Sequence, residues 1–200
     1  VKRGLLFRIK NGLYNIIPYD KDVNIYQPNC YEAAKYITEG VAYYIGYYSA
    51  MQIHSLITQP ALREQVVVNE QMRPSVLRVK DTEFQFVYHN KEHFFGFKNV
   101  WIDNYNKVVC SDLEKTFIDG LFKPDYAGGI VEIAKAIFKS MDKIDYKKLY
   151  EYSKNFNSQA VIKRLGFLLE LLGISHPIIE KLHKRKTDSF ILLEPSYKKE

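Results

Sequence analysis

The sequence is poor in features that mark several specialised protein classes. Only two of its 200 residues are cysteines, and Cys30 and Cys110 fall in different predicted elements. A disulfide-dense scaffold is therefore excluded, and two buried free thiols are favoured over a disulfide or a metal pair. No apolar run approaches the length of a membrane span, and no signal peptide opens the chain. We expect a cytoplasmic protein with no membrane partner.

Recognisable catalytic and phosphate-binding motifs are lacking as well. There is no Walker loop and no Gly-x-Gly-x-x-Gly, and no serine or cysteine nucleophile has a convincing partner. His54 has apolar neighbours, which favours a histidine at a packed edge over a general base. Asp112, Glu114 and Asp119 crowd one predicted helix start, where acids complement the helix dipole and cap free amides. We therefore predict no catalytic residues, no cofactor and no bound metal.

The residues that are present suit a globular domain. The chain is 46% hydrophobic and 26% charged, which excludes a disordered protein. It carries 29 Lys and Arg against 23 Asp and Glu, a net charge of +6 that is compatible with a nucleic-acid partner. Basic clusters are most often solvated faces, but as a set they are compatible with an electropositive surface for nucleic acid or an acidic protein. The residues that we assign to this surface are Arg63, Arg73, Lys163 and Arg164.

Residues 1–27 are predicted to form a β-hairpin followed by a polar linker. Strands over residues 5–9 and 13–17 flank Asn11-Gly12, a dipeptide that accepts the positive φ angles of a type I′ turn. A two-stranded hairpin is marginally stable alone, so this one should pack on the rest of the chain or on something upstream.

Residues 28–200 are predicted to form one α+β domain with a mostly antiparallel sheet. Asn29 should cap an early helix over residues 30–38, and a strand over 42–47 should lead into a short helix over 49–57. The further strands are expected over residues 65–68, 75–79, 84–88, 94–102 and 107–110.

The C-terminal part of the chain has a helical period. Ser111 and Glu114 form a capping box for a helix that Pro124 ends, and a second helix should follow Gly128-Gly129. Leucines recur at three- and four-residue spacing from Leu165, which predicts a buried stripe. Later helices are expected over residues 146–154, 158–172 and 177–186, with a last strand over 190–193.

One motif suggests a metal site. The segment from His89 to His93 matches H-x-x-E-H, the signature of inverted zinc peptidases, and Glu170 follows at a separation that suits their third ligand. That motif needs a helix, which turns both histidines to the metal. Here the alternating aromatic flanks predict a polar loop at a hairpin tip, and Glu170 lies in a leucine-rich helix. We predict that no zinc binds.

Three segments in order resemble AbiEi-type antitoxins. They are residues 43–60 (YYIGYYSAMQIHSLITQP), 111–119 (SDLEKTFID) and 164–170 (RLGFLLE). Shorter blocks with the same resemblance lie at residues 8–14, 66–68, 94–96 and 128–129. Each block alone is a weak signal, but their order and spacing over nearly the whole chain make the resemblance fairly specific.

The resemblance implies a non-enzymatic transcriptional regulator of a type IV toxin–antitoxin (abortive infection) system. In that family an N-terminal winged helix-turn-helix binds inverted repeats in the operon's promoter DNA. The C-terminal domain is the antitoxin, which counteracts a nucleotidyltransferase-like toxin. Residues 1–18 resemble only the wing, so Arg3, Arg8 and Lys10 are expected to contact the DNA backbone. Val1 in place of Met suggests a trimmed N-terminus or a start assigned too late, so selective DNA binding should need upstream residues.

An alternative from another class is a nuclease-like or degenerate nuclease domain that acts on nucleic acid with a metal. A basic α+β domain with scattered acidic residues permits this function. Metal-dependent cleavage of plasmid or RNA, lost on mutation of Asp112 or Glu114, would distinguish it from the antitoxin.

Overall fold

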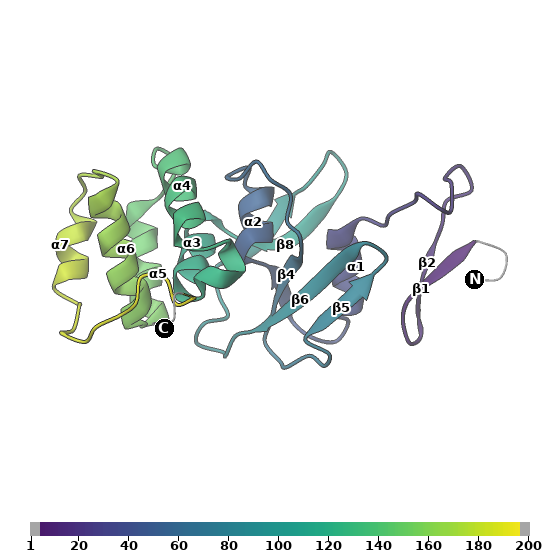
Figure 1. Ribbon diagram of the computed structural model, residues 1–200, viewed down its shortest axis with the longest axis horizontal. Helices are drawn as coiled ribbons and strands as arrows, with labels where there is room; N and C mark the ends of the chain where they lie inside the picture. The colour runs from purple at the N-terminus through teal and green to yellow at the C-terminus, as the bar shows by residue number, and fades with distance from the viewer. Residues whose placement is uncertain (1–4, 197–200) are drawn as a thin grey trace.

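The computed structural model describes residues 5–196 and has the α+β architecture predicted from the sequence. A hairpin lies at one end of the long axis, a sheet in the middle and a set of helices at the other end (Figure 1). The strands are β1 (Leu6–Lys10), β2 (Leu13–Ile16), β3 (Tyr43–Ile45), β4 (Glu64–Val68), β5 (Val76–Val79), β6 (Thr82–Tyr88), β7 (Phe97–Trp101) and β8 (Lys107–Ser111). The helices are α1 (Cys30–Ile37), α2 (Tyr47–Ile53), α3 (Leu113–Phe122), α4 (Ile130–Ser140), α5 (Tyr146–Phe156), α6 (Gln159–Leu171) and α7 (Ile178–His183), with a 3-10 turn, η1 (Pro124–Ala127).

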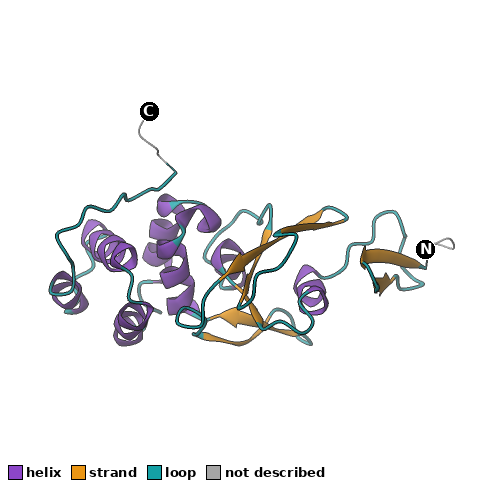
Figure 2. Cartoon of the chain, turned by 90° about the horizontal axis from the view of Figure 1, so that it is seen from below, coloured by secondary structure: helices purple, strands orange, loops and turns teal. Residues whose placement is uncertain are grey.

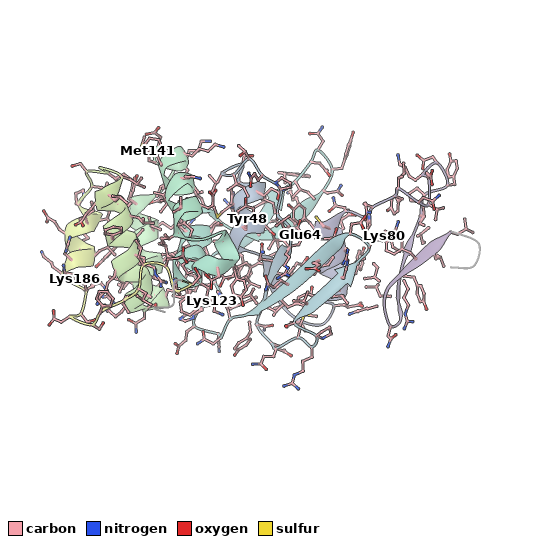
Figure 3. The ribbon with its side chains drawn as sticks, in the orientation of Figure 1. Tyr48, Glu64, Lys80, Lys123, Met141 and Lys186 are labelled. Atoms are coloured by element: carbon pink, nitrogen blue, oxygen red, sulfur yellow. The ribbon has the colours of Figure 1, made fainter. Side chains whose placement is uncertain are left out.

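The predicted N-terminal hairpin is present and packs on the rest of the chain. Strands β1 and β2 pair antiparallel around Gly12, whose φ is +77°. The turn is not the predicted type I′, because Asn11 lacks the positive φ that this type requires at both central residues, and the register of the strands shifts between Arg8 and Lys10. Ile9 joins the core beneath α1, and the Lys10 ammonium donates to the Ile37 carbonyl at 2.7 Å. Lys80 extends from the β5–β6 turn, where its Nζ lies 4.9 Å from the centre of the Phe7 ring and donates to the Tyr26 carbonyl. Figure 3 labels Lys80 at this junction between sheet and hairpin.

The central sheet of the described chain is mixed. Its strand order is β5-β6-β4-β3-β8-β7. Neighbours β5 and β6, β3 and β4, and β7 and β8 run antiparallel, whereas β4 and β6, and β3 and β8, run parallel. Antiparallel contacts therefore predominate without being exclusive.

The two faces of the sheet bury different sets of side chains, because strand residues alternate between the faces. Val66 and Phe84 lie on the face that α1 covers, together with Ile37. Val67 and Val87 lie on the opposite face and pack with the helical set, which begins at α2 and α3. Figure 2 shows the helices stacked beyond one end of the sheet, so this second face is covered only in part.

The helical set contains the predicted leucine stripe. Leu165, Leu168 and Leu169 of α6 are at most 1% exposed. The early helix is capped as predicted, since the Asn29 side chain accepts from the amides of Tyr31 and Glu32.

Three local predictions were wrong. Helix α2 starts at Tyr47 rather than residue 49. Ser111 is not the N-cap of α3, because β8 extends through it and Asp112 accepts from the Lys115 amide instead. Residues 190–193 form no strand. They belong to a C-terminal strap, residues 188–196, which is held by side chains of α6 and by the first turn of α4.

The strap has three attachments. Lys163 binds Ser189, the Arg164 guanidinium donates to the Leu192 carbonyl at 2.7 Å, and the Glu194 carboxylate accepts from the Ile130 amide at 2.8 Å. In the part of the chain that the structure describes, no helix is long and apolar enough to cross a membrane.

Candidate functional site

An open groove of about 830 Å³ lies beside the sheet. The groove begins where polar side chains replace apolar ones along the parallel strands β4 and β6. Gln65 and Gln85 are register partners and lie on the same face as Val67 and Val87, two residues further along each strand. The helices cover the valines, whereas Gln65 and Gln85 line the groove, and Gln65 is bonded through its Oε1 to Ser49 of α2. Side chains on one face thus change from apolar to polar where the helical cover ends.

The groove is lined by aromatic and charged groups around these amides. Tyr48 of α2, labelled in Figure 3, and Tyr126 of η1 lie on its helical side. The Arg63 guanidinium is paired with Glu83 at 2.7 Å, both from the sheet side. The six charged residues of the lining are Arg63, Arg78, Asp81, Glu83, Asp125 and Glu132.

A buried polar network joins β3, α2, α3 and the start of the β6–β7 connection. It consists of Tyr44, Tyr47, His89, Lys115 and Asp119, all of which are at most 2% exposed. Lys115 is ion-paired with Asp119 and donates to the Tyr44 hydroxyl at 3.0 Å, and that hydroxyl donates to Asp119 at 2.9 Å. The Tyr47 ring contacts Tyr126 of the groove with centroids 5.4 Å apart. The network therefore supports the groove from behind.

Burial shifts the titration of this network. Burial lowers the pKa of His89 to about 3, and the nearby charges of Lys115 and Lys123 act in the same direction. Burial also raises the pKa of Asp119 and lowers that of Lys115, while the attraction within the pair opposes both shifts. His89 is thus neutral at pH 7. These groups are enclosed by packed side chains, so their role is to fix β3, α2 and α3 to each other.

A second cluster fixes α3 to α5. Lys148 of α5 lies 3.0 Å from the Asp112 carboxylate and 2.8 Å from that of Glu114. The Tyr152 hydroxyl donates to Asp112 at 2.9 Å. Burial opposes the charge of Lys148, but its bonds to Glu114 and Asp112 prevail and raise its pKa. The carboxylates that a nuclease would need are therefore engaged in an ion-pair cluster.

The predicted basic surface residues do not come together. Arg63 lies in the groove as a partner of Glu83, and exposed Arg73 lines a separate small pocket with Phe86. Lys163 is bound to Ser189 of the strap. The assignment of Arg164 to the surface is wrong: it is 5% exposed, and its guanidinium donates to the Leu121 carbonyl in the last turn of α3 at 2.6 Å.

The predicted DNA contacts have different environments. Arg3 lies outside the described residues. Arg8 is exposed on the hairpin, with its Nε donating to the Lys10 carbonyl at 3.3 Å. Lys10 is half-buried, and its ammonium binds the C-terminal end of α1 through Ile37. Of the two that are described, Arg8 alone extends freely into solvent.

Residues 89–93 form the predicted loop, with residues 90–92 exposed in a turn, but the loop is not a hairpin tip. Strands β6 and β7 are not neighbours: three strands lie between them in the sheet, and His89 at the start of their connection is buried. The His93 ring stacks on Phe156 at 3.8 Å, and its Nε2 bonds the Phe156 carbonyl. Glu170 pairs with His183 instead. Within residues 5–196, no group of three or more His, Cys, Asp or Glu is arranged to hold a metal.

Other expectations about reactive groups were correct. His54 lies at a packed edge, with Nε2 2.8 Å from the Ser111 carbonyl. Cys30 and Cys110 are free thiols, but only Cys110 is fully buried, since Cys30 is partly exposed. Burial raises the pKa of each thiol to about 12. Both thiols are therefore protonated at neutral pH.

Neither the groove nor the buried polar network was predicted from the sequence. The alternation Gln65-Val66-Val67 and Gln85-Phe86-Val87 does signal a face that changes from apolar to polar. The network has a weaker signal, because Lys115 and Asp119 at i and i+4 usually indicate an exposed helix pair. Comparison of the sequence with protein-family models and with curated proteins finds no match.

Proposed function

We propose that this chain is a non-enzymatic regulator and antitoxin of a type IV toxin–antitoxin pair, acting in the cytoplasm against a nucleotidyltransferase-like toxin. The proposal originates in the ordered sequence blocks that resemble AbiEi-type antitoxins. One observation supports it most: the three longest blocks, far apart in sequence, meet around α3.

The contacts between the blocks are specific. Residues 43–60 supply Tyr44 and Tyr47, and residues 111–119 supply Lys115 and Asp119 of the same buried network. The block at residues 164–170 supplies Arg164, which bonds the last carbonyls of α3. The three blocks therefore supply side chains that hold one fold together, as expected if the resemblance reflects common descent.

The position of the hairpin also supports the proposal. Its attachment through Lys10 and Lys80 holds it firmly at one end of the sheet. A wing fixed in this way would carry any upstream DNA-binding helices in a defined orientation. Our proposal therefore includes binding to promoter DNA, with the help of upstream residues, and regulation of the protein's own operon.

A growth assay tests the antitoxin function. A nucleotidyltransferase-like protein encoded beside this gene, where one is present, should stop cell growth when it is expressed, and co-expression of this chain should restore growth. Leu168→Ala should weaken protection by lowering the folded fraction, whereas Leu171→Ala, on the exposed side of the same helix, should protect fully.

Two results would contradict the proposal. One is failure to protect although the protein accumulates in folded form. The other is Mg²⁺-dependent cleavage of plasmid DNA or RNA by the purified chain that disappears in Asp112→Asn, which would establish the nuclease-like alternative.

A further inference from the structure

We infer that the groove binds a basic peptide segment of a protein partner, with carboxylates on its helical side receiving the cationic side chains. This interaction goes beyond the proposed function, which requires no such contact. It rests on the charge of the groove, on an unpaired amide in its floor and on its aromatic wall.

The charge of the groove is opposite to that of the whole protein. Its lining has four carboxylates and two guanidinium groups, although the chain carries a net charge of +6. Arg63 is neutralised by Glu83 at 2.7 Å. Exposed Asp125 has no ion-pair or hydrogen-bond partner among residues 5–196, and Glu132 has only the exposed Lys135. The helical side thus offers carboxylates to an incoming cation.

The floor provides an independent sign of a ligand. Gln65 is only 7% exposed, and its Oε1 accepts from the amide and the hydroxyl of Ser49 at 3.2 and 3.1 Å. Its Nε2 has no partner in the described part of the chain and is not among the polar atoms sealed from solvent. Since Gln65 lines the groove, this amide can donate to a ligand there. A peptide carbonyl is a matching acceptor.

The remaining lining suits the same ligand. Gln85 lies beside Gln65 in register and adds a second amide group for a peptide backbone. Tyr48 and Tyr126 present aromatic surface to the groove. Aromatic rings attract cations and pack against the aliphatic stems of lysine and arginine. The Tyr126 ring is held from behind by Tyr47, so this wall is preorganised.

Nucleic acid is disfavoured by the same charges. Phosphates would approach the carboxylates of Asp81, Asp125 and Glu132, because Arg63 and Glu83 are already paired with each other. A basic peptide, in contrast, is repelled by the net charge of +6 of the protein and attracted by the carboxylates of the groove. Binding of such a peptide would therefore report a local site rather than a general electrostatic attraction.

Fluorescence polarisation with a short fluorescein-labelled peptide of alternating arginine and serine tests the inference. Leu62 lines the groove and is 94% exposed, so Leu62→Lys adds a positive charge there without disturbing the core. We expect it to weaken binding by about tenfold. Leu171→Lys adds the same charge on α6, at a residue that is 65% exposed, and should change the affinity by less than about twofold.

A double variant tests the carboxylates directly. Asp125→Asn with Glu132→Gln should weaken the peptide by about tenfold, whereas Glu151→Gln with Glu170→Gln, which removes two exposed carboxylates outside the groove, should not. Circular dichroism melting checks that each variant is folded.

Three outcomes would overturn the inference. The peptide fails to bind the unmodified protein, it binds both lysine variants equally, or the groove instead binds a fluorescein-labelled single-stranded oligonucleotide that Arg63→Ala releases. Loss of peptide binding only in the groove variants would support it.

Discussion

The hydroxyl of Tyr47 lies 2.7 Å from Nε2 of His89, and both side chains are buried. Tyr47 has a φ of +52°, a left-handed conformation that is costly for an aromatic residue. This strained backbone begins α2 directly after Gly46, where a Cβ would lie 2.7 Å from Val67. The hydrogen bond to His89 and the tight packing of Gly46 together hold the turn from β3 into α2.

Tyr47→Phe should lower the free energy of unfolding by about 1–3 kcal/mol, because it leaves a buried imidazole nitrogen without its partner. Tyr105→Phe is the matched control, since Tyr105 is 88% exposed, and should change stability by less than about 0.5 kcal/mol. Urea denaturation followed by circular dichroism gives both values. Equal stability of the two variants would show that the His89 contact contributes nothing.

Stability should fall in mild acid through His89. Its pKa is lowered to about 3 by burial and by nearby lysines, against a usual value of 6.5. Between these values the unfolded chain binds a proton that the folded chain excludes, so the free energy of unfolding decreases as pH falls. The loss from this residue should be on the order of 3 kcal/mol by pH 4.

Measuring the free energy of unfolding of variants as a function of pH isolates the contribution of His89. His89→Gln should show a smaller loss of stability between pH 7 and pH 4 than the unmodified protein, whatever its stability at pH 7. His183→Gln, at a half-exposed site paired with Glu170, serves as the control. A slope in His89→Gln as steep as in the unmodified protein would mean that His89 is protonated in the fold.

Most of the helices and strands could be predicted, because hydrophobic periodicity and the residues that begin or end an element act over short stretches of sequence. The position of the hairpin turn at Asn11-Gly12, though not its type, the Asn29 cap and the stop at Pro124 all depend on neighbouring residues only. Strand order is not local. Since β6 and β7 are consecutive, they were expected to pair, yet β6 lies beside β4 and β7 at the opposite edge. The segment that joins them therefore crosses the molecule and buries His89.

The site was harder to predict for a related reason. Arg164 belongs to a helix, and its buried position depends on carbonyls of α3 and of the strap, which no helical period reveals. Ser111 and Asp112 were both plausible caps, and only the length of β8 decides between them. The groove depends on where the helical cover ends over the sheet, which requires the assembled fold.

Leu168→Ala should lower the free energy of unfolding by about 2–5 kcal/mol, because Leu168 is 1% exposed and its truncation leaves a cavity. Leu171→Ala, at 65% exposure on the same helix, should cost less than about 0.5 kcal/mol. Thermal melting compares the two. An unchanged melting temperature in Leu168→Ala would place this face of α6 outside the core.

Arg164→Ala should release the C-terminal strap. The guanidinium bonds the Leu192 carbonyl at 2.7 Å and also satisfies carbonyls at the end of α3, so its removal frees both. We expect faster cleavage by chymotrypsin at Phe190, whose 88% exposed ring is already accessible. Lys181→Ala, on the neighbouring α7, should leave the rate unchanged. Equal cleavage rates would show that Glu194 and Lys163 suffice to hold the strap.

Arg8 and Lys10 of the hairpin have the same predicted role in the sequence analysis but different environments in the structure. If residues 1–18 are the wing of a winged helix, the exposed Arg8 contacts phosphate, whereas the Lys10 ammonium is bound to Ile37 at 2.7 Å and positions the hairpin. Residues 1–200 should bind DNA weakly, without sequence preference and with strong salt dependence, because phosphate contacts carry no sequence information. In a gel-shift assay at low salt, Arg8→Ala should weaken all DNA sequences about equally, while Lys10→Ala should mainly lower the melting temperature. Salt-resistant, sequence-selective binding by these residues alone would contradict this division of roles and would assign DNA recognition to the α+β domain.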